Sequence, residues 1–111
     1  MKAVSVGEEA DGTLVLVLRG ELDYTNAGPM AAVIRETVAH RQPRAVCVDL
    51  AAVSFLDSSG IGVLVQALHA AEGAGAGFRV RRPSDKVFDQ LRSSGLLELF
   101  GLADAEPEPP G

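Results

Sequence analysis

A strand pattern changes into a helix pattern within residues 45–64, which read AVCVDLAAVSFLDSSGIGVL. Residues 45–50 form a short apolar run, which is typical of a central strand buried on both faces. From Ile61 to Leu68 the apolar residues recur at i, i+3, i+4 and i+7, the spacing of one helix face. The polar junction Asp57-Ser58-Ser59-Gly60 lies between the two patterns. We therefore predict a buried strand, a short loop and a helix in this order.

The order of the remaining elements predicts a small α/β protein in which helices pack on a mixed sheet of four or five strands. Asp11-Gly12 is typical of a turn that joins two strands as a hairpin. Because crossovers through a helix are right-handed, the strands near 45–50 and 78–82 should be parallel. The expected strands are 3–6, 13–19, 45–50 and 78–81, and the expected helices are about 26–40, 59–73, 84–94 and 96–102.

The size and composition of the chain favour one soluble domain. It has 111 residues, of which 47% are hydrophobic and 23% charged. We expect the domain to span 1–103 and the acidic, proline-rich residues 104–111 to form a disordered tail. The net charge of −5 argues against direct binding of nucleic acid. Without a membrane-length apolar run or the apolar stretch of a signal peptide, we expect a cytoplasmic protein with no membrane partner. Cys47, within an apolar run, should be a buried hydrophobe.

The junction residues leave two alternatives open. In the first, Asp57 or Ser58 is only the N-cap of the following helix, a position that both residue types favour. In the second, the loop is a binding or modification site, because such sites gather at the carboxyl ends of strands in open α/β sheets. Gly60 and Gly62 each lower helix stability by about 1 kcal/mol relative to alanine. Their presence is understandable if another group must approach the helix backbone closely. A phosphate on a hydroxyl here would meet the free N–H groups of the helix start.

Several blocks of sequence, in this order, resemble a STAS domain of the bacterial anti-sigma-factor antagonist type. The resemblance covers roughly residues 4–102, and its Asp-Ser-Ser-Gly-Ile-Gly block is specific. The family fold that it implies is a mixed sheet of four to five strands with helices packed on one side. The blocks are Gly20-Glu21-Leu22-Asp23 followed by Thr25, Val46–Leu50, Val53–Leu64, Val87-Phe88 with Leu91, and Gly95-Leu96.

The resemblance also implies a function, that of a phosphorylation-controlled switch in transcription. The unmodified antagonist would bind an anti-sigma factor that is also a serine kinase, and would thereby free a sigma factor. The kinase would phosphorylate Ser58, the first serine after Asp57, and a PP2C-type phosphatase would remove the phosphate. This chain would need no catalytic residue, metal or cofactor, because the kinase brings ATP, Mg²⁺ and its own base. The alternative is an accessory subunit of a transport system or stress-sensing assembly.

The expected partner-binding switch loop combines two neighbouring loops. Asp57 would either shape the loop or hold the serine hydroxyl for phosphoryl transfer, and Ser59 is a weaker acceptor because it enters the helix. Asp23 and Thr25 would either form a turn and a cap or contribute to the partner surface. An enzyme with Ser58 as nucleophile lacks support, since the chain has no Gly-x-Ser-x-Gly motif. The expected residues of the loop are Asp23, Thr25, Asp57, Ser58, Ser59, Gly60 and Gly62.

Overall fold

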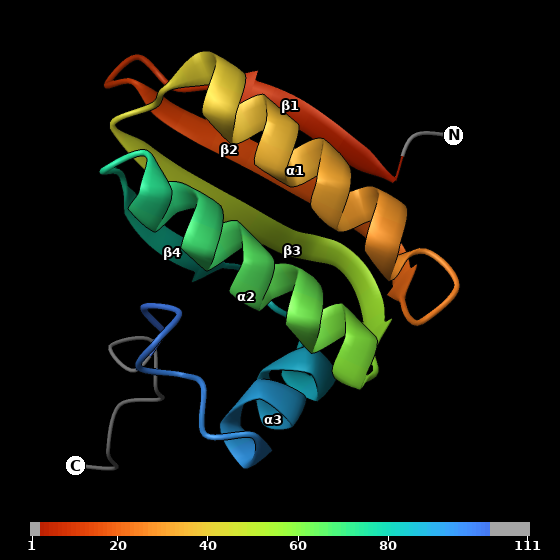
Figure 1. The fold of residues 1–111 in the computed structure, drawn as a ribbon. Coiled ribbons are helices and arrows are strands. Elements are labelled where there is room, and N and C mark those ends of the chain that lie inside the picture. The colour runs from red at the N-terminus through yellow and green to blue at the C-terminus, as the bar shows by residue number, and fades with distance from the viewer. Residues whose placement is uncertain (1–2, 103–111) are drawn as a thin grey trace, which may run out of the picture.

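The structure is a computed structural model that describes residues 3–102. Within this range the strands form one four-stranded sheet in the order β1-β2-β3-β4, and a helix follows each of β2, β3 and β4 (Figure 1). The strands are β1 (Val4–Glu8), β2 (Thr13–Leu22), β3 (Ala45–Leu56) and β4 (Gly77–Arg81). The helices are α1 (Ala27–Arg41), α2 (Ser58–Gly73) and α3 (Asp85–Ser93). The predicted α/β class is confirmed.

The sheet is mixed because β1 and β2 form a hairpin while the later connections are crossovers. β1 pairs antiparallel with β2, whereas β2 pairs with β3 and β3 with β4 in parallel. Gly12 lies in the hairpin turn at a φ of 90°, a conformation that favours glycine. The Thr13 N–H donates to the Asp11 carboxylate at 2.9 Å and closes the turn. The predicted hairpin and the predicted parallel pairing are both confirmed.

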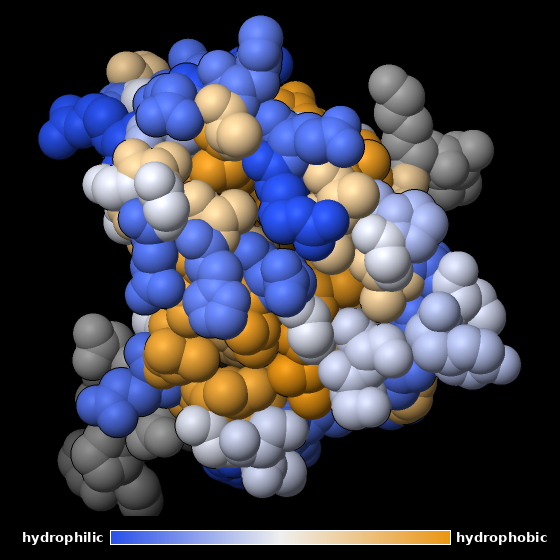
Figure 2. All heavy atoms as spheres, viewed as in Figure 1, coloured by the Kyte–Doolittle hydropathy of each residue, from blue (hydrophilic) through white to orange (hydrophobic). Residues whose placement is uncertain are grey.

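Helices α1 and α2 lie side by side over one face of the sheet (Figure 1). Alternate residues of β2 and β3 point toward them and form the core with the buried residues of both helices. On this face hydrophilic residues gather over α1, whereas apolar residues reach the surface beside α2 (Figure 2), where Ile61 and Val65 are partly buried. The fully buried strand residues in this core include Leu14, Leu16, Leu18, Val46, Val48 and Leu50.

β3 is longer than the strand predicted at 45–50 and bends toward its C-terminal end (Figure 1). Its register against β2 shifts twice, because β3 contributes an extra residue at each of two bulges. At the first bulge the Ala51 N–H donates to the Asp49 carboxylate at 2.9 Å. The bulges bring Leu56 opposite Leu22, so the carboxyl ends of β2 and β3 lie together.

Asp49 is a buried carboxylate whose position in β3 alternates with the core residues, so it lies on the face opposite α1 and α2. It accepts hydrogen bonds from Nε of Arg81 and Nε of Arg82, both at 3.0 Å. Burial by itself raises the pKa of Asp49, but the bonds from Arg82, the Ala51 N–H and Arg81 outweigh burial and hold this pKa below its ordinary value. Arg81 also pairs with Glu9 at 3.1 Å, so one network joins β3, β4 and the hairpin turn.

The C-terminal segment 96–102 differs from the prediction. It forms successive turns rather than a helix, so the predicted fourth helix is wrong. Phe100 is fully buried, and its carbonyl accepts a hydrogen bond from the Val80 N–H at 2.8 Å. Gly101 follows at a φ of 72°, which a helix does not allow. A single helical bond, from the Phe100 N–H to the Leu96 carbonyl at 3.1 Å, is therefore not continued into a helix. The predicted tail at 104–111 lies outside the described residues.

Candidate functional site

The junction between β3 and α2 lies where the carboxyl ends of two parallel strands meet. The Asp57 N–H donates to the carbonyl of Leu22 at 3.1 Å, so contact with β2 continues into the junction. Ser58 is the first residue of α2 and is exposed, whereas Ser59 is partly buried. The junction therefore lies beside the loop that leads from β2 to α1.

Asp57 joins the two loops through both oxygens of its carboxylate. Its Oδ1 atom accepts a hydrogen bond from the Gly60 N–H at 2.9 Å, which makes Asp57 the N-cap of α2. Its Oδ2 atom accepts a hydrogen bond from the Tyr24 N–H at 3.2 Å. The sequence left Asp57 and Ser58 as candidates for the N-cap of α2. In the structure the N-cap is Asp57. Since both oxygens already accept N–H groups, the contacts favour the loop-shaping role of Asp57.

Asp23 and Thr25 form a compact turn beside Asp57. The Asp23 Oδ1 atom accepts hydrogen bonds from the Thr25 N–H at 2.9 Å and from the Thr25 hydroxyl. These bonds hold the pKa of Asp23 below its ordinary value. Asn26 donates its side-chain amide to the Glu21 carbonyl at 2.7 Å and makes no side-chain cap on α1. The turn is therefore present, and contact of these residues with a partner stays a prediction.

The two glycines of the junction differ in their surroundings. A Cβ atom on Gly60 would lie 2.2 Å from the carbonyl oxygen of Leu22, so only glycine fits there. A Cβ atom on Gly62 would have no neighbouring atom within 4 Å. The close approach expected at Gly60 is thus made by β2 of the same chain. Gly60 is buried against β2, whereas Gly62 is partly exposed.

The described residues carry neither a metal cluster nor a membrane span. Within residues 3–102, no group of three His, Cys, Asp or Glu side chains is arranged to hold a metal ion. Over the same range, no helix combines the length and the apolar character needed to cross a membrane. Cys47 is buried, and burial raises the pKa of its thiol. The thiol is therefore a core group, as the sequence predicts.

Comparison with known proteins assigns the chain to a family. The sequence model of the STAS domain matches residues 6–108, which is most of the chain. The chain belongs to the STAS domain family. Among characterised relatives, this STAS domain is 28% identical over 99 residues to the anti-sigma F factor antagonist of Paenibacillus polymyxa. That match covers 89% of this chain and 85% of the relative.

Solved structures show the same fold in anti-sigma factor antagonists. An antagonist from Mycobacterium paratuberculosis is 31% identical with a TM-score of 0.73, and the match covers 87% of this STAS domain and 80% of that chain. The unphosphorylated antagonist SpoIIAA is 26% identical with a TM-score of 0.69, covering 85% and 82% of the two chains. A sulfate transporter family protein from Wolinella succinogenes, at 18% identity, TM-score 0.70 and coverage of 88% and 76%, shows the fold alone. The predicted family and fold are confirmed.

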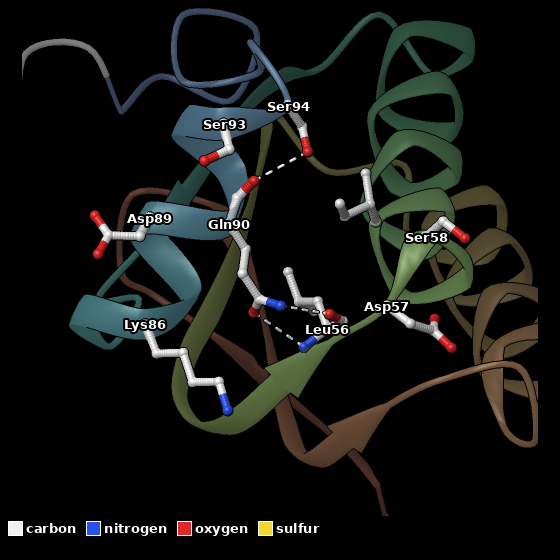
Figure 3. Close-up of a pocket in the computed structure, with 9 residues that line it drawn as sticks. Leu56, Asp57, Ser58, Lys86, Asp89, Gln90, Ser93 and Ser94 are labelled. Atoms are coloured by element: carbon white, nitrogen blue, oxygen red, sulfur yellow. Dashed lines mark hydrogen bonds between the residues drawn. The ribbon is translucent and has the colours of Figure 1, made fainter.

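Gln90 of α3 is a residue of this STAS domain that the sequence reasoning missed. Its side chain hydrogen-bonds the backbone of Leu56, immediately before Asp57. An open groove between α2 and α3 runs past this contact, with Lys86, Asp89, Ser93 and Ser94 along its α3 side. The hydroxyl of Ser58 and the carboxylate of Asp57 point away from α3 (Figure 3). The available signal was the helical spacing, which puts polar Gln90 on the same face as buried Val87.

Proposed function

We propose that this STAS domain is an anti-sigma-factor antagonist whose binding to an anti-sigma factor is switched off by phosphorylation of Ser58. The similarity to antagonists at 31% and 28% identity supports the partner class. The structural observation that carries the proposal is the exposed hydroxyl of Ser58 at the start of α2. Ser59 is partly buried in the same turn, which makes it the poorer acceptor.

A phosphate on Ser58 fits the junction without a change of fold. The first N–H groups of a helix have no partners within the helix, and the positive end of the helix dipole favours an anion. The Ser58 side chain is exposed at this end of α2, so a phosphate would displace water rather than core residues. The free energy of unfolding should therefore change little on phosphorylation.

The charge of the phosphate accounts for the loss of binding. A phosphoserine carries about −1.5 to −2 charges at pH 7. The phosphate would add to the acidic character of two joined loops, which already hold Asp57 and Asp23. A partner surface that fits a neutral hydroxyl would have to desolvate this dianion. Each increment of about 1.4 kcal/mol in that cost weakens binding about tenfold, so the switch needs no refolding.

Tyr24 extends the proposed partner surface beyond the residues expected from the sequence. Tyr24 is 80% exposed, and its N–H donates a hydrogen bond to the Asp57 carboxylate. Exposed tyrosines are frequent anchors of protein interfaces because they bury a large area at a small entropic cost. We therefore include Tyr24 in the partner surface and leave out buried Gly60. The remaining proposed contacts are Asp23, Thr25, Asp57, Ser58, Ser59 and Gly62.

The proposed partners are an anti-sigma factor with serine kinase activity and a PP2C-type phosphatase. The kinase would supply ATP, Mg²⁺ and the general base, so this chain would supply only the acceptor hydroxyl. Its own role would be binding and not catalysis.

Phosphorylation by the cognate anti-sigma factor tests this function. Incubation with that protein and ATP should add one phosphate, mapped to Ser58 by mass spectrometry, and Ser58→Ala should abolish it. Ser59→Ala is the matched control and should be phosphorylated at the wild-type rate. Phosphate that persists in Ser58→Ala at the wild-type rate would show that another hydroxyl is the acceptor. Capture of a transport ATPase without any anti-sigma factor would contradict the proposed partner class.

A further inference from the structure

Gln90 holds the backbone of Leu56 through both ends of its side-chain amide. Its Nε2 atom donates to the Leu56 carbonyl at 2.7 Å, and its Oε1 atom accepts from the Leu56 N–H at 3.3 Å. One side chain of α3 thus satisfies both backbone polar groups of a residue in β3 (Figure 3). Leu56 directly precedes the cap Asp57 and the proposed acceptor Ser58.

The two hydrogen bonds between Gln90 and Leu56 form a clamp. This clamp lies where β3 continues past the end of the neighbouring strand β4. β4 pairs with β3 only as far as Asp49, so within residues 3–102 the last residues of β3 have no strand on the β4 side. On the other side, the Asp57 N–H still bonds to the Leu22 carbonyl of β2. The amide of Gln90 therefore takes the place that a peptide group of an additional strand would occupy. Without it, the Leu56 N–H and carbonyl would each lose a partner in a half-buried position.

The helix that carries Gln90 is itself fixed at several points. Val87 and Leu91 are fully buried in the core on the same side of α3. The Gln90 carbonyl accepts a hydrogen bond from the Ser94 hydroxyl at 2.9 Å. The side chain of Gln90 therefore extends from an anchored backbone and can hold Leu56 in place.

We propose that Gln90 is a positioning residue for the phosphorylation switch: it fixes Leu56, and through Leu56 it holds Asp57 and Ser58 where a kinase can reach the hydroxyl. The inference rests on the proposed function and adds to it a residue of α3, outside the switch loop. Without the clamp, the C-terminal end of β3 would become more mobile. The Ser58 hydroxyl would then occupy the position required for phosphoryl transfer in a smaller fraction of encounters with the kinase.

Amide hydrogen exchange of the free protein tests the clamp without any partner. Gln90→Met keeps the length of the side chain and removes both polar groups. We expect exchange of the hydrogen-bonded amides of Leu56, Asp57 and Gly60 to rise about tenfold or more, because two hydrogen bonds that hold this segment are lost. Exchange of residues 14–18 in β2 should not change, which would show that the fold is intact. Gln90→Glu keeps an acceptor for the Leu56 N–H but sets a carboxylate oxygen against the Leu56 carbonyl, so exchange of the same amides should also rise.

Ser84→Ala is the matched control, because it removes the cap of α3 and leaves the clamp in place. Exchange of the Leu56, Asp57 and Gly60 amides in this variant should stay within about twofold of wild type, since the lost cap bond lies at the far end of α3. Wild-type exchange of the Leu56, Asp57 and Gly60 amides in Gln90→Met, or equal rises in Gln90→Met and Ser84→Ala, would overturn the inference.

The kinetics of phosphorylation by the anti-sigma kinase give the functional readout. We expect kcat/KM for Ser58 to fall in Gln90→Met, because the acceptor hydroxyl is held less well in the position that the kinase uses, and to stay at the wild-type value in Ser84→Ala. An unchanged kcat/KM in Gln90→Met, together with faster exchange, would overturn the positioning role. If the wild-type chain accepted no phosphate, the proposed function would be the part that fails, and the exchange pattern would still decide whether Gln90 holds the loop.

Discussion

Gly60 and Gly62 stand two positions apart, yet only one of them is required by packing. Gly60 lies against the carbonyl oxygen of Leu22, at a distance of 2.2 Å for an added Cβ atom, and Gly62 has open space around it. Two glycines in one helix turn suggested that a group from outside the helix approaches the backbone closely. At Gly60 that group is the backbone of Leu22 in β2. The open position at Gly62 is the one that a partner would reach.

Alanine substitutions should separate these glycines. Gly60→Ala should destabilise the protein by about 1 to 3 kcal/mol, because Leu22 is backbone in the sheet and cannot move aside cheaply. Gly62→Ala should be neutral or stabilising by up to about 1 kcal/mol, because alanine favours a helix. Urea unfolding of both variants checks this. A free energy of unfolding of Gly60→Ala equal to that of wild type would contradict the contact with Leu22.

Asp57 should matter for stability as well as for binding. Asp57→Ala removes the cap of α2 and the bond to the Tyr24 N–H, so we expect a loss of about 1 to 2 kcal/mol. Ser58→Ala, at the adjacent exposed position, should stay within about 0.5 kcal/mol of wild type and serves as the control. Chemical denaturation gives both values. Equal stability of the two variants would show that the cap does not hold the loops together.

At the scale of elements, the first half of β3 could be predicted from the sequence, but its second half could not. Its first half was predicted, because a continuous apolar run in an α/β pattern indicates a strand covered on both faces. The extension to Leu56 was not, because bulges depend on bonds such as that between Asp49 and the Ala51 N–H, which leave no periodic signal. The segment 96–102 failed for a similar reason: its apolar spacing fits a helix, but Phe100 pairs with the edge of β4.

The network of Asp49 should contribute more to stability than a surface ion pair. Asp49→Ala should cost about 2 to 3 kcal/mol, because the Ala51 N–H loses its acceptor and Arg81 loses a buried partner. Arg82 can turn toward water, which limits the loss. Asp89→Ala, at the exposed pair with Arg92, is the control and should cost less than about 0.5 kcal/mol. Unfolding curves that show equal losses in both variants would contradict the role given to Asp49.

The same carboxylate predicts a pH dependence of folding. Its pKa in the folded state is held below the unfolded value, so the unfolded chain binds a proton first as the pH falls. The stabilisation from Asp49 is therefore complete above about pH 5 and is lost as the pH falls through the folded pKa. Urea midpoints at pH 7, 4 and 3 should fall more steeply for wild type than for Asp49→Asn. Parallel falls would mean that Asp49 is not linked to acid unfolding.

At the scale of the whole molecule, the arrangement of strands and helices could be predicted from the sequence. The hydrogen bonds that connect the elements around the site could not. The family blocks, such as Asp57-Ser58-Ser59-Gly60, identify the fold and the proposed acceptor. The tie from Asp57 to Tyr24 and the clamp from Gln90 to Leu56 depend on bends and distances between elements far apart in the sequence. Neither residue spacing nor composition carries that information. At this scale, the proposed switch is an unchanged fold that presents the Ser58 hydroxyl to a partner.

Calorimetric titration of the cognate anti-sigma factor with this protein, unmodified and phosphorylated at Ser58, tests that account most directly. Circular dichroism of the two forms should coincide, because the phosphate lies on an exposed helix start. The unmodified form should bind, and the phosphorylated form should bind at least about tenfold more weakly, since about 1.4 kcal/mol of desolvation and repulsion is enough for that change. Equal affinity of the two forms would contradict the proposal that Ser58 is the switch.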